Sequence, residues 1–250
     1  PLLLLILVLV LVFSPIGSMR AQDNPDTKAP EPGPATVGLN VRDFGAVGDG
    51  KADDTAALQR ALDAARVPAE PTGVGPALVV LPPGHYRVTE SLKMDHRHGL
   101  IVIRGTGGVD TFGANPIDPK RRRRPRAATQ IVWDGPEGGT LFDIWGAGGL
   151  QMHDLGLIGS GKAGVLIGVN SPRAHGAGRY TFERMTLVGA EVGFETGNDS
   201  HINSADMTFL DVHFVRLKTG FRTMSVQNVD FTFIRPRIIG CELGLHFHKG

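Results

Sequence analysis

The sequence predicts an all-β protein built as a parallel β-helix, and two observations carry this prediction. Four segments align without gaps through ten positions, with starts 30, 27 and 24 residues apart: "LQMHDLGLIG" (150–159), "YTFERMTLVG" (180–189), "MTFLDVHFVR" (207–216) and "FTFIRPRIIG" (231–240). Each is followed by a short strand that begins with glycine: "GVLIG" (164–168), "GFETG" (193–197), "GFRTM" (220–224) and "GLHFH" (244–248). Repeats of this length, with strands and turns but no helices, are typical of β-helices.

The chain begins with features of an exported protein. The apolar run "LLLLILVLVLVF" (2–13) is too short to span a membrane and is typical of the apolar part of a signal peptide. We therefore expect a signal peptide over 1–21, with an uncleaved anchor as the alternative, and a secreted, periplasmic or cell-surface protein without a stable membrane span. Residues 22–38 are rich in proline and polar residues, which predicts a disordered linker. A net charge of +1 argues against a nucleic-acid partner.

A strand, a glycine-rich turn and a helix open the domain in "NVRDFGAVGDGKADDTAALQRALDAA" (40–65). Asp53 or Asp54 is expected to cap a helix over 54–66. Small apolar residues at helical spacing, including Leu58 and Leu62, predict that this helix lies close against a flat surface. The nearby carboxylates Asp43 and Asp49 also allow a metal cluster, but turns and caps account for them.

Two further segments complete a resemblance to a known family: "ALVVLPPGHYRV" (77–88) and "GLIVIRGTGG" (99–108). With the opening motif they resemble the start of the pectate-lyase-like, rhamnogalacturonase/epimerase-like β-helix domains (pectin lyase fold), and the resemblance covers about residues 40–135. It implies a right-handed, single-stranded parallel β-helix with a short N-terminal capping helix. Because residue 250 falls in mid-repeat, we expect 39–250 to be the N-terminal part of a truncated domain.

Equivalent residues on successive turns of a β-helix lie ~4.8 Å apart, so columns of residues matter more than linear motifs. Three columns of charged or polar residues follow from the repeats. Lys162, Glu191, Lys218 and Glu242 precede the glycine of the last strand by two positions, and Leu166, Glu195, Arg222 and His246 follow it by two. The third column, Asp154, Arg184, Asp211 and Arg235, alternates in sign and is expected to form a cross-strand ladder.

The columns beside the glycine are expected to face solvent and line a shared groove. The position resembles the strand that carries the catalytic carboxylates of polygalacturonase-like enzymes, although the paired Asp-Asp and the Gly-His-Gly of those hydrolases are missing. We expect Glu191 and Glu242 to be catalytic, and Glu195, Lys218, Arg222 and His246 to bind substrate. No protein metal site is expected, although calcium is possible for a lyase.

These features favour a secreted lyase or glycoside hydrolase that acts on a uronate-containing or other acidic polysaccharide. The alternative is a non-catalytic β-helix, an adhesin or a carbohydrate-binding scaffold, since β-helices serve both purposes. The sequence leaves open the sugar and the choice between lyase, hydrolase and epimerase. The basic segment "KRRRRPR" (120–126) is either a solvated loop or a contact for acidic or sulfated polysaccharide.

Overall fold

The computed structural model describes residues 38–66, 77–107, 128–171, 177–197, 204–225 and 229–247. The expected signal peptide, the linker up to residue 37 and the basic segment 120–126 lie outside these residues. Residues 36–250 form one compact unit. None of the helices in the described segments is long and apolar enough to cross a membrane.

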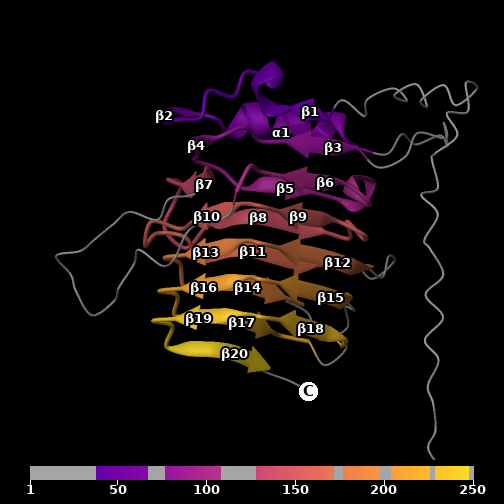
Figure 1. Ribbon diagram of the computed structural model, residues 1–250, viewed down its shortest axis with the longest axis vertical. Helices are drawn as coiled ribbons and strands as arrows, with labels where there is room; N and C mark the ends of the chain where they lie inside the picture. The colour runs from indigo at the N-terminus through magenta and orange to yellow at the C-terminus, as the bar shows by residue number, and fades with distance from the viewer. Residues whose placement is uncertain are drawn as a thin grey trace, which may run out of the picture. The chain divides into compact units, whose positions relative to one another are not determined.

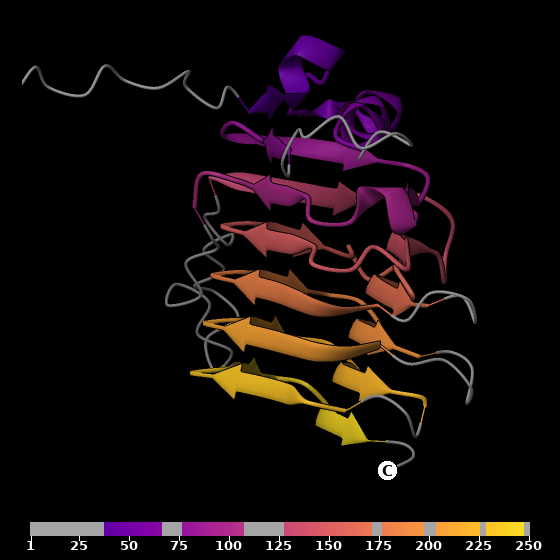
Figure 2. The same ribbon diagram turned by 90° about the vertical axis from the view of Figure 1, so that its right-hand side faces the viewer.

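The fold consists of three sheets, each made of parallel strands (Figures 1 and 2). The first sheet contains β1 (Leu39–Asn40), β3 (Leu78–Val80), β6 (Val102–Arg104), β9 (Gln151–His153), β12 (Ala177–Glu183), β15 (Ser204–Leu210) and β18 (Phe231–Ile234). The second contains β2 (Asp49–Asp53), β4 (Gly84–Val88), β7 (Thr129–Trp133), β10 (Gly156–Ile158), β13 (Thr186–Val188), β16 (His213–Val215) and β19 (Arg237–Ile239). The third contains β5 (Leu92–Met94), β8 (Thr140–Trp145), β11 (Val165–Asn170), β14 (Val192–Thr196), β17 (Thr219–Thr223) and β20 (Leu243–Phe247).

The chain visits the three sheets in turn, so each rung after the first adds one strand to every sheet, whereas the first rung has β1 and β2 and continues into α1. Neighbouring rungs pair in parallel: Gln151 lies beside Thr181, Thr181 beside Thr208, and Thr208 beside Thr232. Figure 1 shows the successive layers from β4 (purple) to β20 (yellow). The predicted parallel β-solenoid is therefore confirmed, and so is the expected parallel pairing of residues 150–157 with 180–187.

Stacked side chains fill the interior along the predicted apolar column. Met152, Phe182, Phe209 and Phe233 occupy equivalent positions on four rungs. The rings of Phe182 and Phe209 are 5.2 Å apart and nearly parallel, and those of Phe209 and Phe233 are 4.7 Å apart. Phe194 belongs to the third sheet, and its ring meets that of Phe209 edge to face, with the ring centroids 4.9 Å apart. These contacts between aromatic rings join the sheets across the core and support the register of the rungs.

The expected helix is present as α1 (Thr55–Ala64), between two short 3₁₀ helices, η1 (Val41–Phe44) and η2 (His96–His98). Of the two expected caps, Asp53 takes the role, because its carboxylate accepts from the backbone N–H of Thr55 at 3.1 Å. Asp54 does not cap the helix with its side chain. Its buried carboxylate instead accepts from the backbone N–H groups of Val47 and Gly48, at 2.6 and 3.1 Å. Asp54 thus holds the glycine-rich turn in place.

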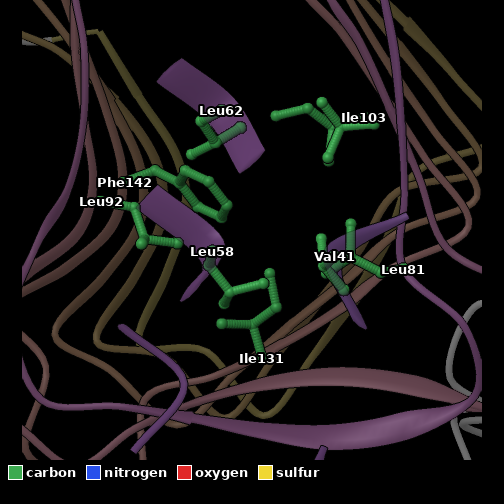
Figure 3. A pocket seen from close by; sticks show the side chains of 9 residues that line it. Val41, Leu58, Leu62, Leu81, Leu92, Ile103, Ile131 and Phe142 are labelled. Atoms are coloured by element: carbon green, nitrogen blue, oxygen red, sulfur yellow. The ribbon is translucent and has the colours of Figure 1, made fainter. Parts of the chain in front are cut away.

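The apolar side of α1 packs onto the first strands of the solenoid. Leu58 and Leu62 are buried, as expected, and line an apolar cavity of about 10 Å³. Figure 3 shows the two leucines together with Val41, Leu81, Leu92, Ile103, Ile131 and Phe142. A space of this size holds at most about one water molecule, and its lining offers that water no polar partner.

The alternating column of charges forms a ladder at the corner between the first and second sheets. Arg184 pairs with Asp154, and Arg235 pairs with Asp211. All four residues have a left-handed backbone, with φ between 49° and 60°. The prediction of a cross-strand ladder is confirmed.

Candidate functional site

The third sheet carries a row of polar side chains on its outer face. Glu195 in β14 lies beside Arg222 in β17, and Arg222 lies beside His246 in β20. Their neighbours Phe194 and Phe221 are buried in the core. Because side chains alternate along a strand, Glu195, Arg222 and His246 point away from the core. All three side chains are half-buried rather than fully exposed.

Glu195 and Arg222 form an ion pair within this row. The Nε of Arg222 donates to Oε2 of Glu195 at 2.7 Å, and Nη2 of Arg222 donates to the same oxygen. The side chains are 18% and 32% exposed, so water screens the pair only in part. Arg222 therefore holds Glu195 as a neutralised partner.

A second column lies four residues before this row, at the bends that immediately precede β14, β17 and β20. Glu191, Lys218 and Glu242 are exposed on three consecutive rungs. Their backbones follow one another, since the N–H of Thr219 bonds to the carbonyl of Glu191 and that of Leu243 bonds to the carbonyl of Lys218. None of the three forms an ion pair with another residue that the structure describes. At ~4.8 Å per rung, the backbones of Glu191 and Glu242 lie about 9–10 Å apart, with Lys218 between them.

The two columns are close but do not merge into one cluster. Glu191 and Glu195 are four residues apart, which corresponds to about 13 Å in an extended strand. The structure therefore brings together Glu195, Arg222 and His246, and separately Glu191, Lys218 and Glu242. A ligand that touches both columns has to extend along the strand direction.

One of the expected rungs has a different register. The sequence alignment placed Lys162 beside Glu191 and Leu166 beside Glu195, but Val165 pairs with Val192 and Gly168 pairs with Glu195. Leu166 is fully buried. Lys162 bonds through Nζ to Oδ1 of Asp134 at 2.8 Å, outside both columns. Hydrogen bonds from Lys162 and Arg87 lower the pKa of the Asp134 carboxyl.

Three further residues, not predicted from the sequence, continue the row toward the N-terminus. Asp143 in β8 lies beside Gly168, and Lys93 in β5 lies beside Asp143. Trp145, two positions beyond Asp143, is 37% exposed. These rungs lie outside the four aligned repeats, so column counting did not reach them. The pattern "FDIW" (142–145), with polar or aromatic residues alternating with buried ones, was the available signal.

A polar hollow of about 360 Å³ lies on the first sheet, away from the predicted residues. Its lining consists of Arg179, Tyr180, Thr181, Asp206, Thr208, Asp230 and Thr232. The described residues contain no group of three or more His, Cys, Asp or Glu side chains placed to hold a metal ion.

Comparison with known proteins agrees with the fold. Residues 38–107 match the family described as rhamnogalacturonase A/epimerase, pectate lyase-like. Mannuronan C5-epimerase AlgE2 of Azotobacter vinelandii is 54% identical over 182 residues, which cover 69% of this chain and 16% of that protein. The chain thus spans only a small part of this relative.

Solved structures give the same architecture. The A-module of mannuronan C-5 epimerase AlgE6 from Azotobacter vinelandii superposes with a TM-score of 0.54 and 21% identity, over 81% of this chain and 56% of that chain. The tailspike protein gp49 of Acinetobacter baumannii bacteriophage Fri1, a capsular polysaccharide depolymerase, gives 0.53 and 16%, over 85% and 37%. The resemblance predicted from the N-terminal motifs is thereby confirmed: residues 38–107 are similar to the pectate-lyase-like, rhamnogalacturonase A/epimerase family.

Proposed function

We propose that this chain belongs to an exported enzyme that acts on a uronate-containing or other acidic polysaccharide, as a lyase or a glycoside hydrolase. The observation that carries the proposal is the pair of charged columns on consecutive rungs of the third sheet. Relatives named for action on mannuronan or on a capsular polysaccharide support the substrate class. The proposal includes a right-handed solenoid whose N-terminal end is closed by α1, since Leu58 and Leu62 are buried there.

The columns fit chemistry at C5 of a uronate. Elimination begins with removal of the C5 proton, and so does epimerisation at that carbon. Each needs a base near the proton and a cation that neutralises the sugar carboxylate. Lys218 and Arg222 are the cations of the two columns, and Glu191 and Glu242 are the carboxylates with no ion-pair partner among the described residues. Glu195, which is bonded to Arg222, serves as the residue that orients this guanidinium.

Hydrolysis places a different demand on the same carboxylates. An inverting glycosidase needs two carboxyl groups roughly 6.5–9.5 Å apart. The two-rung separation of Glu191 and Glu242 lies near the upper end of this range. Calcium is a possible cofactor for a lyase, but the described residues offer no cluster of three ligands for it.

The three reactions give different products, so one experiment separates them. The full-length protein is incubated with a polyuronate in D₂O. A lyase gives the ultraviolet absorbance of a C4–C5 double bond. A hydrolase gives new reducing ends without that absorbance. An epimerase incorporates deuterium at C5 while the polymer keeps its length.

Glu191→Gln and Glu242→Gln are expected to lower the turnover rate at least 100-fold, with unchanged thermal unfolding. Glu137→Gln, at an exposed position in a turn, is the matched control and is expected to keep full activity. Full activity in both column variants would remove the catalytic role from this pair. Binding of polyuronate without any of the three products would favour the non-catalytic scaffold.

A further inference from the structure

Trp145 is an exposed aromatic side chain on the outer face of the third sheet. The neighbouring Phe142 and Ile144 are buried, so Asp143 and Trp145 both point outward from β8. The indole Nε1–H of Trp145 donates to Oδ1 of Asp143 at 2.7 Å. This bond fixes the orientation of the ring, which therefore presents an apolar surface without losing further rotamer freedom when a ligand binds.

On the rung next to Asp143, Gly168 leaves one position of this face without a side chain, and Asn170 lies beside Trp145. Gly168 lies between Asp143 and Glu195 in the row. A Cβ built on Gly168 would make only ordinary contacts, the nearest at 3.5 Å from Cγ2 of Thr140, and the residue has no left-handed backbone. Neither packing nor conformation therefore requires glycine here. Its absent side chain leaves room between Asp143 and the Glu195–Arg222 pair.

The cationic side chain of Lys93 lies on the other side of Asp143 from Gly168. Lys93 is exposed one rung away, and its ammonium forms no ion pair within the described residues. The backbones of Lys93 and Trp145 are diagonal neighbours, about 8 Å apart. The apolar ring face of Trp145, the open position at Gly168 and the cation of Lys93 together suit a sugar ring that carries a carboxylate.

We propose that Trp145, positioned by Asp143, is a stacking platform for one pyranose ring of an acidic polysaccharide. The ring lies over Gly168, and its carboxylate faces Lys93. This subsite rests on the proposed function, since it lies in the same row as Glu195 and Arg222. It extends that row toward the N-terminus and assigns three binding residues that act apart from Glu191 and Glu242.

The two tryptophans of the chain allow a direct test. Trp133 is 1% exposed, and its Nε1–H is bonded to the carbonyl of Pro136, so Trp145 dominates quenching by acrylamide. An oligouronate is titrated into this 250-residue chain, and acrylamide quenching and binding heat are both recorded. We expect the ligand to protect the fluorescence, and Trp145→Ala to weaken binding about 10-fold. Trp145→Phe keeps an aromatic face and is expected to lose less than about 3-fold.

Further variants separate the parts of the subsite. Lys93→Ala is expected to weaken an oligouronate several-fold but not a neutral oligosaccharide of the same length. Gly168→Val, which suits a strand, is expected to block the subsite without lowering thermal stability. Val47→Ala, an exposed apolar residue outside the third sheet, is the control and should leave binding unchanged.

The outcomes distinguish this inference from the proposed function. If the parent protein binds the oligouronate while Trp145 stays open to acrylamide and Trp145→Ala binds equally well, the subsite is overturned and the proposed function stands. Absence of binding to polyuronates by the parent protein overturns both.

Discussion

Arg184 donates from Nε and Nη2 to the two carboxylate oxygens of Asp154 on the preceding rung, at 2.6 and 2.8 Å. Arg235 repeats this geometry with Asp211 two rungs further on, with both distances at 2.7 Å. Each bond joins two residues with left-handed backbones. The ladder therefore combines a favourable ion pair with a backbone conformation that is unfavourable for residues other than glycine.

This combination predicts an unusual order of stability at residue 184. Arg184→Ala removes the ion pair and keeps the left-handed backbone, whereas Arg184→Gly removes both the ion pair and the conformational cost. We expect the glycine variant to be more stable than the alanine variant by about 1 kcal/mol in urea unfolding. At Thr181, in the strand before the corner, alanine is expected to be the more stable replacement. Equal midpoints for the two variants at 184 would contradict the assigned strain.

The same ladder predicts a contribution to stability that depends on acid. The hydrogen bond from Arg184 lowers the pKa of the Asp154 carboxyl. A lowered pKa in the folded state means that the contribution is complete above the unfolded value of about 3.9 and is lost as the pH falls through the folded pKa. The free energies of unfolding of the parent and of Arg184→Ala should therefore differ at pH 6 by about 1 kcal/mol or less, and this difference should shrink as the pH falls below about 3.9. A constant difference over this range would show that the loss comes from packing.

A buried histidine beneath α1 predicts a second pH effect, closer to neutrality. His98 has no exposed surface, and its Nε2 lies 3.0 Å from Nε of Arg66 while Nδ1 lies 3.0 Å from Oδ1 of Asp95. Burial is the largest influence and lowers the pKa of His98 below its usual value, despite the carboxylates of Asp95 and Asp63. Because the unfolded chain takes up this proton first, stability is full above about pH 6.5 and falls as the pH drops below it.

Replacing this histidine should flatten the pH dependence. His98→Gln is expected to unfold at a more uniform temperature between pH 7 and pH 5, although at a lower temperature at pH 7. His85→Gln, at an exposed position, is the control and should follow the parent. If His98→Gln keeps the full pH dependence, the acid sensitivity lies with other groups.

Charge placed on the apolar side of α1 should be strongly destabilising. Leu62 is 3% exposed and lines the cavity between the helix and the first rungs (Figure 3). Leu62→Asp buries a carboxylate without a partner, and we expect a loss of about 3 kcal/mol or more in urea unfolding. Leu62→Ala, which removes volume but adds no charge, is expected to lose about 2–3 kcal/mol. Unchanged midpoints would mean that α1 does not seal the core.

The basic segment offers a test that depends only on the sequence. Replacing Arg121–Arg124 with serine is expected to weaken retention on a polyuronate or sulfated-glycan gel and to flatten its salt dependence, with little effect on folding. Identical retention with and without the arginines would reduce the segment to a solvated insertion.

Much of the fold could be predicted because it follows from local repeats in the sequence. The columns through Phe182 and through Asp154 follow from repeats that align residue by residue, and parallel stacking then fixes their neighbours. The role of Asp54 could not be predicted in this way. Its position before the helix suggests a cap, but its carboxylate accepts from the backbone N–H groups of Val47 and Gly48. These contacts depend on the conformation of the folded turn, which the sequence pattern does not specify.

The candidate site was predicted less completely, because the corner between β10 and β11 differs in length from the corresponding corner of the next rung. Counting from the glycines gave the correct rungs for Glu195, Arg222 and His246 but the wrong one for Leu166. Ile158 pairs with Val188, and Val165 pairs with Val192, so the corner holds three extra residues in the earlier rung. A fixed offset from glycine cannot detect such an insertion. Asp143 and Trp145 were missed because their rung precedes the aligned repeats.

That longer corner also shows where the chain tolerates additional length. Ser160 and Gly161 both have left-handed backbones there, yet the strands on either side stay paired with the next rung without a shift. The loop at Ser160 and Gly161 is therefore a suitable place to insert a foreign peptide for display. Such an insertion would leave the pairing of the strands, and therefore every column along the solenoid, unchanged.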